Sequence, residues 1–360
     1  MRKGWEYKRL GEVCTIKAGY TPKKNELSDN GAYPYYKVAD MNTLGNDVYL
    51  DITSSYKIDA NKLFPKGAIV FPKNGAAVTP NKKRILKYDT IVDLNTGVAI
   101  FPKSINEKFA YYWFIDTDFK KYVRGGALPT LDIKSLKDKP FPSMDKSIQL
   151  AIVSELDKIN ELIRLKKEQL KDFDNLAQSL FYEMFGDPVE NEKGWEVKKL
   201  GEVYKMKSGD SLSTKSFEEG DIPVYGGNGI SGYHNQYNKD GSYIIIGRVG
   251  VYCGNVRIVK GRFWLTDNAF ELLYDNSSQN EVFVCSLLTH LNLRQYANAA
   301  AQPVISNNTL KHVSIPLPPL PLQHLFAQRI EQIEHQKSEV QKAITDLETL
   351  LASRMQYWFE

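Results

Sequence analysis

The chain has 360 residues, of which 42% are hydrophobic and 25% charged, and this composition predicts a globular protein of about two domains. It has no run of about 18 apolar residues and no apolar stretch behind its basic start, so we expect a cytoplasmic protein without a membrane span or secretory signal. Three cysteines without a CxxC pair and five histidines without an HExxH motif argue against a disulfide framework and a zinc site, so no metal is expected.

Charge is distributed unevenly along the chain, although the net charge is only +4. Residues 1–144 carry 24 Lys and Arg against 15 Asp and Glu, whereas residues 187–320 carry 13 against 14. Clustered positive charge attracts polyanions, so charge alone predicts that nucleic acid binds to the first segment. The second segment would need neutral hydrogen-bonding groups.

An internal repeat divides the chain into two halves. Gly4–Val13 recurs as Gly194–Val203 with eight of ten positions identical, and Gln149 reappears as Gln323 at an offset of 174. The two halves therefore share one plan, and the second half is 16 residues shorter. We expect four segments, namely a globular domain at 1–144, a helix and linker at 145–186, a second globular domain at 187–320 and a second helix at 321–360.

Residues 1–144 show the pattern of an α+β domain. Short β-rich segments at 68–71, 90–92 and 98–101 precede a helix-like segment at 109–122. The loops carry basic side chains, amides and tyrosines, the groups that grip phosphates and read base edges. Taken singly, the same residues are also ordinary turn formers. The candidate DNA-binding residues here are Thr21, Lys23, Lys24, Tyr35, Lys37, Lys73, Asn74, Lys82, Lys83, Arg84 and Asn95.

Residues 145–186 are predicted to form a long helix. Apolar side chains recur at alternating steps of four and three, interrupted only by Lys166, and this spacing is typical of a coiled-coil seam. The same spacing also fits generic packing in a helical bundle. The predicted seam residues are Ile152, Leu156, Ile159, Ile163, Leu170, Phe173 and Leu180.

Residues 187–320 repeat the α+β pattern, with β-rich segments at 243–246, 255–259 and 270–273 and a helix-like segment at 281–296. Three strings, IPVYGGNGISGYH, IGRVGVYCGNVR and LTDNA, place planar donors and acceptors on glycine-flanked loops. One of them contains GxGxxG, but a β-rich segment follows it, which argues against a dinucleotide site. The candidate DNA-binding residues here are Tyr225, Asn228, Tyr233, His234, Arg248, Tyr252, Asn255, Arg257 and Asn268.

Residues 321–360 repeat the helical seam, with Lys337 and Arg354 as its polar members. If a pseudo-two-fold axis relates the repeats, the two helices pair as an antiparallel coiled coil. About 38 residues at ~1.5 Å each would make a rod of roughly 55–60 Å, which would act as a ruler. The predicted seam residues are Phe326, Ile330, Ile333, Val340, Ile344, Leu347 and Leu351.

The doubled GWExKxLGEV box, the strings IPVYGGNGISGY, IIIGRVGVYCGN and TDNAF, and the heptad helix closing each half resemble the DNA-specificity subunit of type I restriction-modification systems. The resemblance covers essentially the whole chain. It implies two target-recognition domains, each followed by a conserved helix, that read a split, asymmetric site in double-stranded DNA with a fixed spacer. It also implies a contact by Gln302, where the first half has Leu128.

The resemblance further implies that the paired helices dock two methyltransferase subunits and that restriction subunits join them. S-adenosylmethionine, ATP and magnesium are then expected only on those partners. A non-catalytic role agrees with the sequence, which has no GxxxxGK[ST] phosphate loop and no Asp/Asn-Pro-Pro-aromatic motif of amino-methyltransferases. Two alternatives stay open, a coiled-coil adaptor whose domains bind proteins and a specificity module of a modification-only system.

Overall fold

The computed structural model describes residues 5–29, 31–53, 55–57, 62–125, 129–298 and 302–359. The chain folds into two compact units, of which unit 1 contains residues 1–166 and 343–360 and unit 2 contains residues 167–342. Two long helices, α4 (Lys146–Phe185) and α8 (Leu320–Phe359), contribute to both units. Among the described residues, no helix combines the length and the apolar character needed to cross a membrane.

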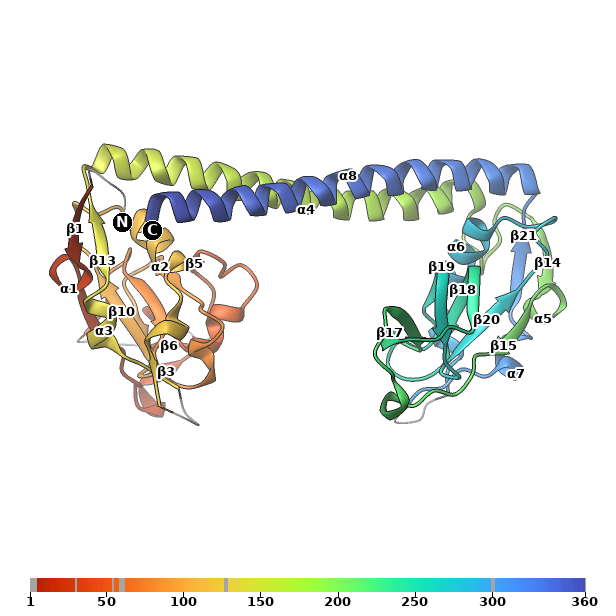
Figure 1. Cartoon of the computed structure of the whole chain (residues 1–360), viewed down its shortest axis with the longest axis horizontal. Helices are drawn as coiled ribbons and strands as arrows, with labels where there is room; N and C mark the ends of the chain where they lie inside the picture. The colour runs from red at the N-terminus through yellow and green to blue at the C-terminus, as the bar shows by residue number, and fades with distance from the viewer. Residues whose placement is uncertain are drawn as a thin grey trace. The chain divides into compact units, whose positions relative to one another are not determined.

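Unit 1 is built on a five-stranded sheet in the order β2-β10-β7-β8-β5 and a four-stranded sheet in the order β3-β6-β4-β9, and β1 pairs with β13 (Figure 1). Its strands are β1 (Glu6–Arg9), β2 (Thr15–Ala18), β3 (Leu27–Ser28), β4 (Tyr33–Tyr36), β5 (Tyr49–Leu50), β6 (Tyr56–Lys57), β7 (Ile69–Pro72), β8 (Arg84–Leu86), β9 (Ile91–Val92), β10 (Thr96–Ile100), β11 (Val123–Arg124), β12 (Thr130–Leu131) and β13 (Pro140–Ser143). Its shorter helices are α1 (Leu10–Val13), α2 (Glu107–Asp116) and α3 (Ile133–Lys137).

The core of unit 1 lies between α2 and the five-stranded sheet. The ring of Phe71 on β7 stacks 5.4 Å from that of Phe114 on α2, and both side chains are fully buried. The side chain of Asn106 begins α2 by accepting hydrogen bonds from the backbone N–H groups of its first turn. The predicted β-rich segments are confirmed as β7, β9 and β10, and the predicted helix as α2 and the short 3-10 helix that follows it.

Unit 2 is built on one six-stranded sheet in the order β15-β20-β18-β19-β16-β17, with β14 paired to β21. Its strands are β14 (Glu196–Lys199), β15 (Lys205–Ser208), β16 (Ile222–Gly226), β17 (Gly229–His234), β18 (Lys239–Gly247), β19 (Val256–Leu265), β20 (Ala269–Leu273) and β21 (Ser314–Leu317). Its shorter helices are α5 (Leu200–Val203), α6 (Glu281–His290) and α7 (Asn307–Leu310). The expected α+β class is therefore confirmed for both halves of the chain.

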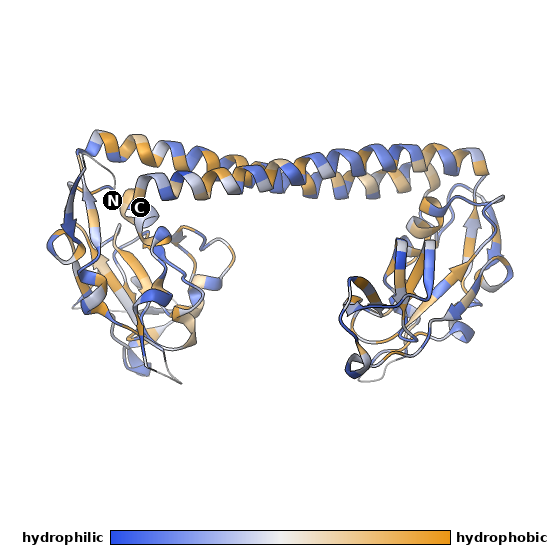
Figure 2. Ribbon diagram, viewed as in Figure 1, coloured by the Kyte–Doolittle hydropathy of each residue, from blue (hydrophilic) through white to orange (hydrophobic). Residues whose placement is uncertain are grey.

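The two long helices contact each other in an antiparallel sense. In unit 1, Arg354 near the end of α8 pairs with Glu155 near the start of α4. In unit 2, the Lys337 ammonium lies 2.8 Å from the Asp174 carboxylate of α4. Every predicted seam residue is buried or partly buried, and Figure 2 shows hydrophobic and hydrophilic residues alternating along both helices. The pairing covers apolar side chains that neither helix could bury alone.

The sequence repeat also appears in how each core meets the long helices. In unit 1, the ring of Phe109 on α2 lies 5.6 Å from that of Phe359 at the end of α8. In unit 2, the ring of Phe283 on α6 lies 4.8 Å from that of Phe185 at the end of α4. Each domain core is thus closed by the last phenylalanine of one long helix.

A buried glutamine ties each domain to the start of the helix that follows it. The Gln149 side chain accepts a hydrogen bond from the Asn106 N–H at 2.8 Å, and Gln323 accepts one from the Asn280 N–H at 2.9 Å. Both glutamines are almost fully buried. A buried side-chain amide destabilises the fold unless it is hydrogen-bonded, and both glutamines are. The two contacts attach the start of each long helix to the preceding domain in the same way in both units.

Candidate nucleic-acid interface

The turn between β16 and β17 is held against the sheet by direct backbone contact. A Cβ atom on Gly227 would lie 2.6 Å from the Val249 carbonyl oxygen, and one on Gly247 would lie 2.2 Å from the Gly227 carbonyl oxygen. Only glycine allows this approach at either position. The packing fixes the turn and leaves the Asn228 side chain exposed at its tip.

Next to this turn, three backbone hydrogen bonds join three segments of unit 2 at Arg248. The Arg248 N–H donates to the Asn268 carbonyl oxygen, the Ile305 N–H donates to the Arg248 carbonyl oxygen, and the Gly250 N–H donates to the Pro303 carbonyl oxygen, each at 2.9 Å. We call this arrangement the junction of unit 2. It brings Arg248, Asn268 and the loop that carries Gln302 together.

Unit 1 contains the same junction. The Lys73 N–H donates to the Asn95 carbonyl oxygen, the Leu131 N–H donates to the Lys73 carbonyl oxygen, and the Gly75 N–H donates to the Pro129 carbonyl oxygen, each at 2.8 Å. Lys73 is therefore the structural counterpart of Arg248, and Asn95 that of Asn268. In both units, three equivalent backbone hydrogen bonds bring together predicted DNA-binding residues from separate loops.

The surroundings of the two junctions differ. In unit 1, the Asn74 side-chain amide donates to the Asn95 side-chain oxygen at 3.3 Å, and the Thr21 hydroxyl accepts from the Leu94 N–H at 3.4 Å. In unit 2, the Arg248 guanidinium lies 5.3 Å from the centre of the Phe270 ring. The residues before Pro129 and before Gln302, at 126–128 and 299–301, lie outside the described residues, and these include the Leu128 compared with Gln302 above.

An open pocket of about 380 Å³ lies beside the junction of unit 2. Its lining includes Asn228, Asn268 and Gln302, three exposed residues with carboxamide side chains that come from three separate loops. It also includes the hydroxyl residues Thr214, Ser231 and Thr266, and no charged side chain. We call it the amide pocket. Groups of this kind read base edges, because they offer donors and acceptors without a net charge.

A second pocket of about 310 Å³ in unit 2 is basic. It lies between the start of β19 and the segment after α6, and it is lined by Arg257 and Arg294 with Asn255, Thr289 and Asn292. Neither arginine has an ion-pair partner among the described residues. We call it the arginine pocket. The sequence pointed to Asn255 and Arg257 but not to Arg294, which falls in the segment expected to be helical.

Several predicted DNA-binding residues are instead used inside the fold. The Lys83 side chain is fully buried, with its ammonium 2.7 Å from the Thr117 carbonyl oxygen. Arg84 donates to the carbonyl oxygens of Met41, Lys83 and Asn46. Burial lowers the pKa of Lys83 to about 6 and lowers the pKa of Arg84. Lys83 and Arg84 are therefore not part of the proposed interface, because their side-chain nitrogens are bonded to carbonyl oxygens within unit 1.

Two aromatic candidates are also internal. Tyr35 is 1% exposed and belongs to the core of unit 1, where burial raises the pKa of its phenol. His234 is 4% exposed, and its Nδ1 accepts a hydrogen bond from the Glu218 N–H at 3.0 Å. Both positions hold the fold and present no group at the surface.

The remaining candidates lie at or near the surface. Lys23, Lys24, Lys37, Tyr233 and Tyr252 are exposed. Lys82 is partly buried and bonds to the Asn42 side chain, and the partly buried Tyr225 packs 5.5 Å from the Phe263 ring. The structure does not gather these residues into either pocket of unit 2.

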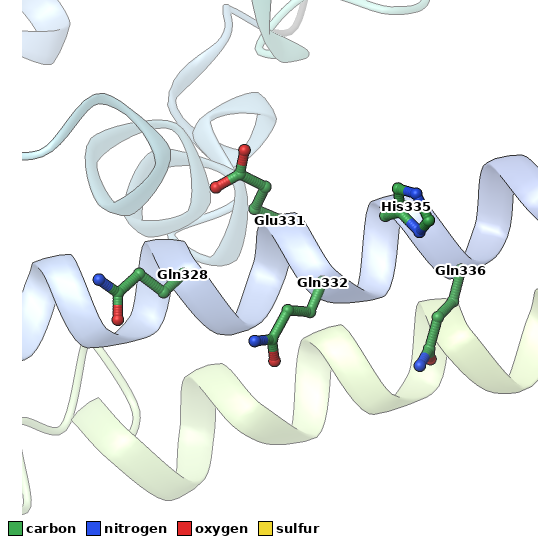
Figure 3. Close-up of a pocket in the computed structure, with 5 residues that line it drawn as sticks. All are labelled: Gln328, Glu331, Gln332, His335 and Gln336. Carbon is green, nitrogen blue, oxygen red and sulfur yellow. The ribbon is translucent and has the colours of Figure 1, made fainter.

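A further hollow, of about 420 Å³, runs along α8 and is lined by Gln328, Glu331, Gln332, His335 and Gln336 (Figure 3). All five side chains come from this single helix, so no second element converges on it. Within the described part of the chain, no group of three or more His, Cys, Asp or Glu side chains is arranged to hold a metal ion.

Comparison with known proteins places these features in context. The family model described as "Type I restriction modification DNA specificity domain" matches residues 2–172 and 192–349. The type I restriction enzyme EcoprrI specificity subunit of Escherichia coli is 28% identical over 355 residues, covering 91% of this chain and 87% of that protein.

Two solved structures share the fold over the whole chain. One comes from work on the assembly and conformational transition of a type I restriction-modification system, with a TM-score of 0.69 and 18% identity, and it covers 100% of this chain and 98% of that one. The other is the S subunit of a type I restriction-modification system from M. genitalium, with a TM-score of 0.59, 18% identity and the same coverage.

Proposed function

The chain belongs to the type I restriction modification DNA specificity family, and on that premise we propose that each of its two units reads one half of a split site in double-stranded DNA. As the specificity subunit it directs a type I restriction-modification complex to its target and is itself non-catalytic. The observation that supports two readers is the repeated junction, with Lys73 and Asn95 in unit 1 and Arg248 and Asn268 in unit 2.

The two readers use different chemistry, so the two halves of the site differ. The basic segment 1–144 suits phosphate contacts through its exposed lysines. The nearly neutral segment 187–320 combines one local arginine pocket with the amide pocket. We place the two target-recognition domains at these segments and the two conserved helices at 145–186 and 321–360. The site is then bipartite and asymmetric, with a fixed non-specific spacer.

The long helices are the proposed docking surface for two methyltransferase subunits, which restriction subunits then join. S-adenosylmethionine, ATP and magnesium bind on those partners in this proposal. Exposed apolar side chains on both helices are compatible with it, because they could contribute to an apolar surface that a partner covers. Those that are between 43% and 50% exposed are Ile148, Leu150, Leu162, Leu165 and Leu176 on α4 and Leu325, Leu350 and Tyr357 on α8.

Replacing Lys73, Asn74 and Asn95 of the unit 1 junction by Ala is expected to relax one half of the recognised motif and leave the other half unchanged. Each lost base contact costs about 1–3 kcal/mol of discrimination, enough to make a position degenerate. The measurement is the pattern of methylated adenines in cells that express the chain with its neighbouring methyltransferase. Exposed Lys66 on the same unit provides a matched control as Lys66→Ala. Methylation that does not depend on this chain would favour the adaptor alternative.

In the arginine pocket, Arg257→Ala and Arg294→Ala are each expected to weaken DNA binding about equally for all sequences. A phosphate contact releases a counterion, so each variant should lower the slope of log affinity against log salt by about 1. Binding of the complete complex is measured from low to moderate salt. Arg262→Ala is the control, because Arg262 is already paired with Asp240 at 3.2 Å. A slope that stays constant in both variants would remove this pocket from the interface.

A further inference from the structure

The amide pocket contains polar groups that the fold itself does not satisfy. Asn228, Asn268 and Gln302 line it, and none of their exposed side chains makes a hydrogen bond within the described part of the chain. Thr266 also lines it, and this residue is 3% exposed with a hydroxyl oxygen that lacks any hydrogen-bond partner. A buried polar atom without a partner is costly, but this oxygen has almost no exposed surface, so the groups that a ligand can reach are the exposed side chains of Asn228, Asn268 and Gln302.

The lining favours a base edge over a phosphate. It has no charged side chain, whereas phosphate sites in proteins rely on Arg, Lys or clustered backbone N–H groups. A carboxamide presents one donor and one acceptor side by side. That pair matches the N7 acceptor and N6 amino donor that adenine shows in the major groove.

Guanine is disfavoured because no arginine lines the amide pocket. Guanine offers two acceptors, O6 and N7, which an arginine fork contacts. Arg248, the arginine of the neighbouring junction, does not line the pocket, and its guanidinium stacks over the Phe270 ring, with two long contacts of 3.4 Å from Nη1 to the Ser208 hydroxyl and the Asp267 carbonyl oxygen and a buried Nε that has no hydrogen-bond partner. The other nearby cation, Arg257, contributes to the arginine pocket and not to this lining.

We propose that unit 2 reads an adenine of its half-site through N6 and N7, using one carboxamide of the amide pocket, that of Asn228, Asn268 or Gln302. The inference rests on the proposed function, since it names the base that this unit recognises. Unit 1 offers a different set of groups, because Lys73 stands in place of Arg248 and the side-chain oxygen of Asn95, the counterpart of Asn268, accepts from the Asn74 amide at 3.3 Å. The adenine contact therefore belongs to one half of the site.

The experiment replaces each adenine in the unit 2 half-site, one at a time, by 7-deaza-2′-deoxyadenosine, which has C–H in place of N7. The probe is a duplex that carries the mapped site, and the protein is the full chain in complex with its methyltransferase subunits. We expect one replacement to weaken binding by about 2- to 12-fold, because it removes one of the two hydrogen bonds of a bidentate contact that contributes about 1–3 kcal/mol in all. Replacing adenines in the unit 1 half-site should not change how much Asn228, Asn268 and Gln302 contribute to binding affinity.

Protein variants then identify the reader. Asn228→Ala, Asn268→Ala and Gln302→Ala are compared, and in the variant that lacks the reading carboxamide the same 7-deaza replacement should have little further effect, because the contact is already lost. Asn276→Ala is the matched control, since Asn276 is an exposed carboxamide of unit 2 outside the pocket, and it should keep the full sensitivity. Unchanged recognition of the unit 1 half-site shows that each variant is folded and assembled.

Three results would overturn the inference while leaving two-unit recognition in place. One is a unit 2 half-site in which no adenine is sensitive to the replacement. Another is sensitivity to 7-deazaguanine only. The third is full adenine sensitivity in the pocket variants, which would place the reader on a partner subunit. A half-site without any sequence preference would instead contradict the proposed function of unit 2.

Discussion

Adding one heptad to each long helix is expected to lengthen the spacer of the recognised site by about three base pairs. Seven helical residues span about 10 Å, and each base pair of DNA adds about 3.4 Å. The insertions follow Lys166 in α4 and Lys342 in α8, at the points where both helices pass from one unit to the other. A heptad that continues the seam preserves the four-and-three spacing on which helix pairing depends. The methylated motif in genomic DNA gives the spacer directly.

The control adds the same length of chain without lengthening a helix. Seven residues inserted at Ser277, in the exposed turn between β20 and α6, should leave the spacer unchanged. If the helix variant recognises both half-sites with the original spacer, helix length does not set the spacing. That result would leave the docking of partner subunits as the proposed role of α4 and α8.

The helices could be predicted from sequence because burial along a helix leaves a periodic trace. Ile152, Leu156 and Ile159 are spaced so that one face is apolar, and all three are buried in the structure. The repeat at an offset of 174 adds a second signal. Gln149 and Gln323 have no periodicity of their own, but their matched positions correspond to matched contacts with Asn106 and Asn280.

The candidate site could be predicted only in part, because a glycine-rich string does not reveal which side chains face outward. Tyr233 and His234 are neighbours at the end of β17, yet Tyr233 is 55% exposed and His234 only 4%. Successive side chains of a strand point to opposite faces, so the strand pairing decides between them. The pairing also brings Gln302 to Asn228 across 74 positions of sequence, which no local pattern reports.

Replacing Lys83 by Met is expected to flatten the pH dependence of unit 1 stability between about pH 6 and pH 10. Burial lowers the pKa of Lys83 from 10.5 to about 6, Asp118 and Asp116 oppose this shift, and Lys139 adds to it. The unfolded chain holds the proton throughout this window, whereas the folded chain has lost it. Stability of the parent therefore rises with pH by up to about 1.4 kcal/mol per unit, and below pH 6 this contribution is constant.

Lys83→Met removes the free-energy cost of neutralising the lysine on folding. It also leaves the Thr117 carbonyl oxygen without its donor, which destabilises the variant by about 1–3 kcal/mol at every pH. Relative to the parent, the variant should therefore be most favoured near pH 6 and progressively less so towards pH 10. Urea unfolding at several pH values, followed by hydrogen exchange of the β7 and β10 amides, isolates unit 1 from unit 2. The neighbouring Lys82→Met removes a partly buried lysine and should keep the slope of the parent. If the free energy of unfolding has the same pH slope in the parent and in Lys83→Met, Lys83 stays charged in the fold. Its contacts with the Thr117 carbonyl oxygen and the Phe119 ring would then be those of a buried cation.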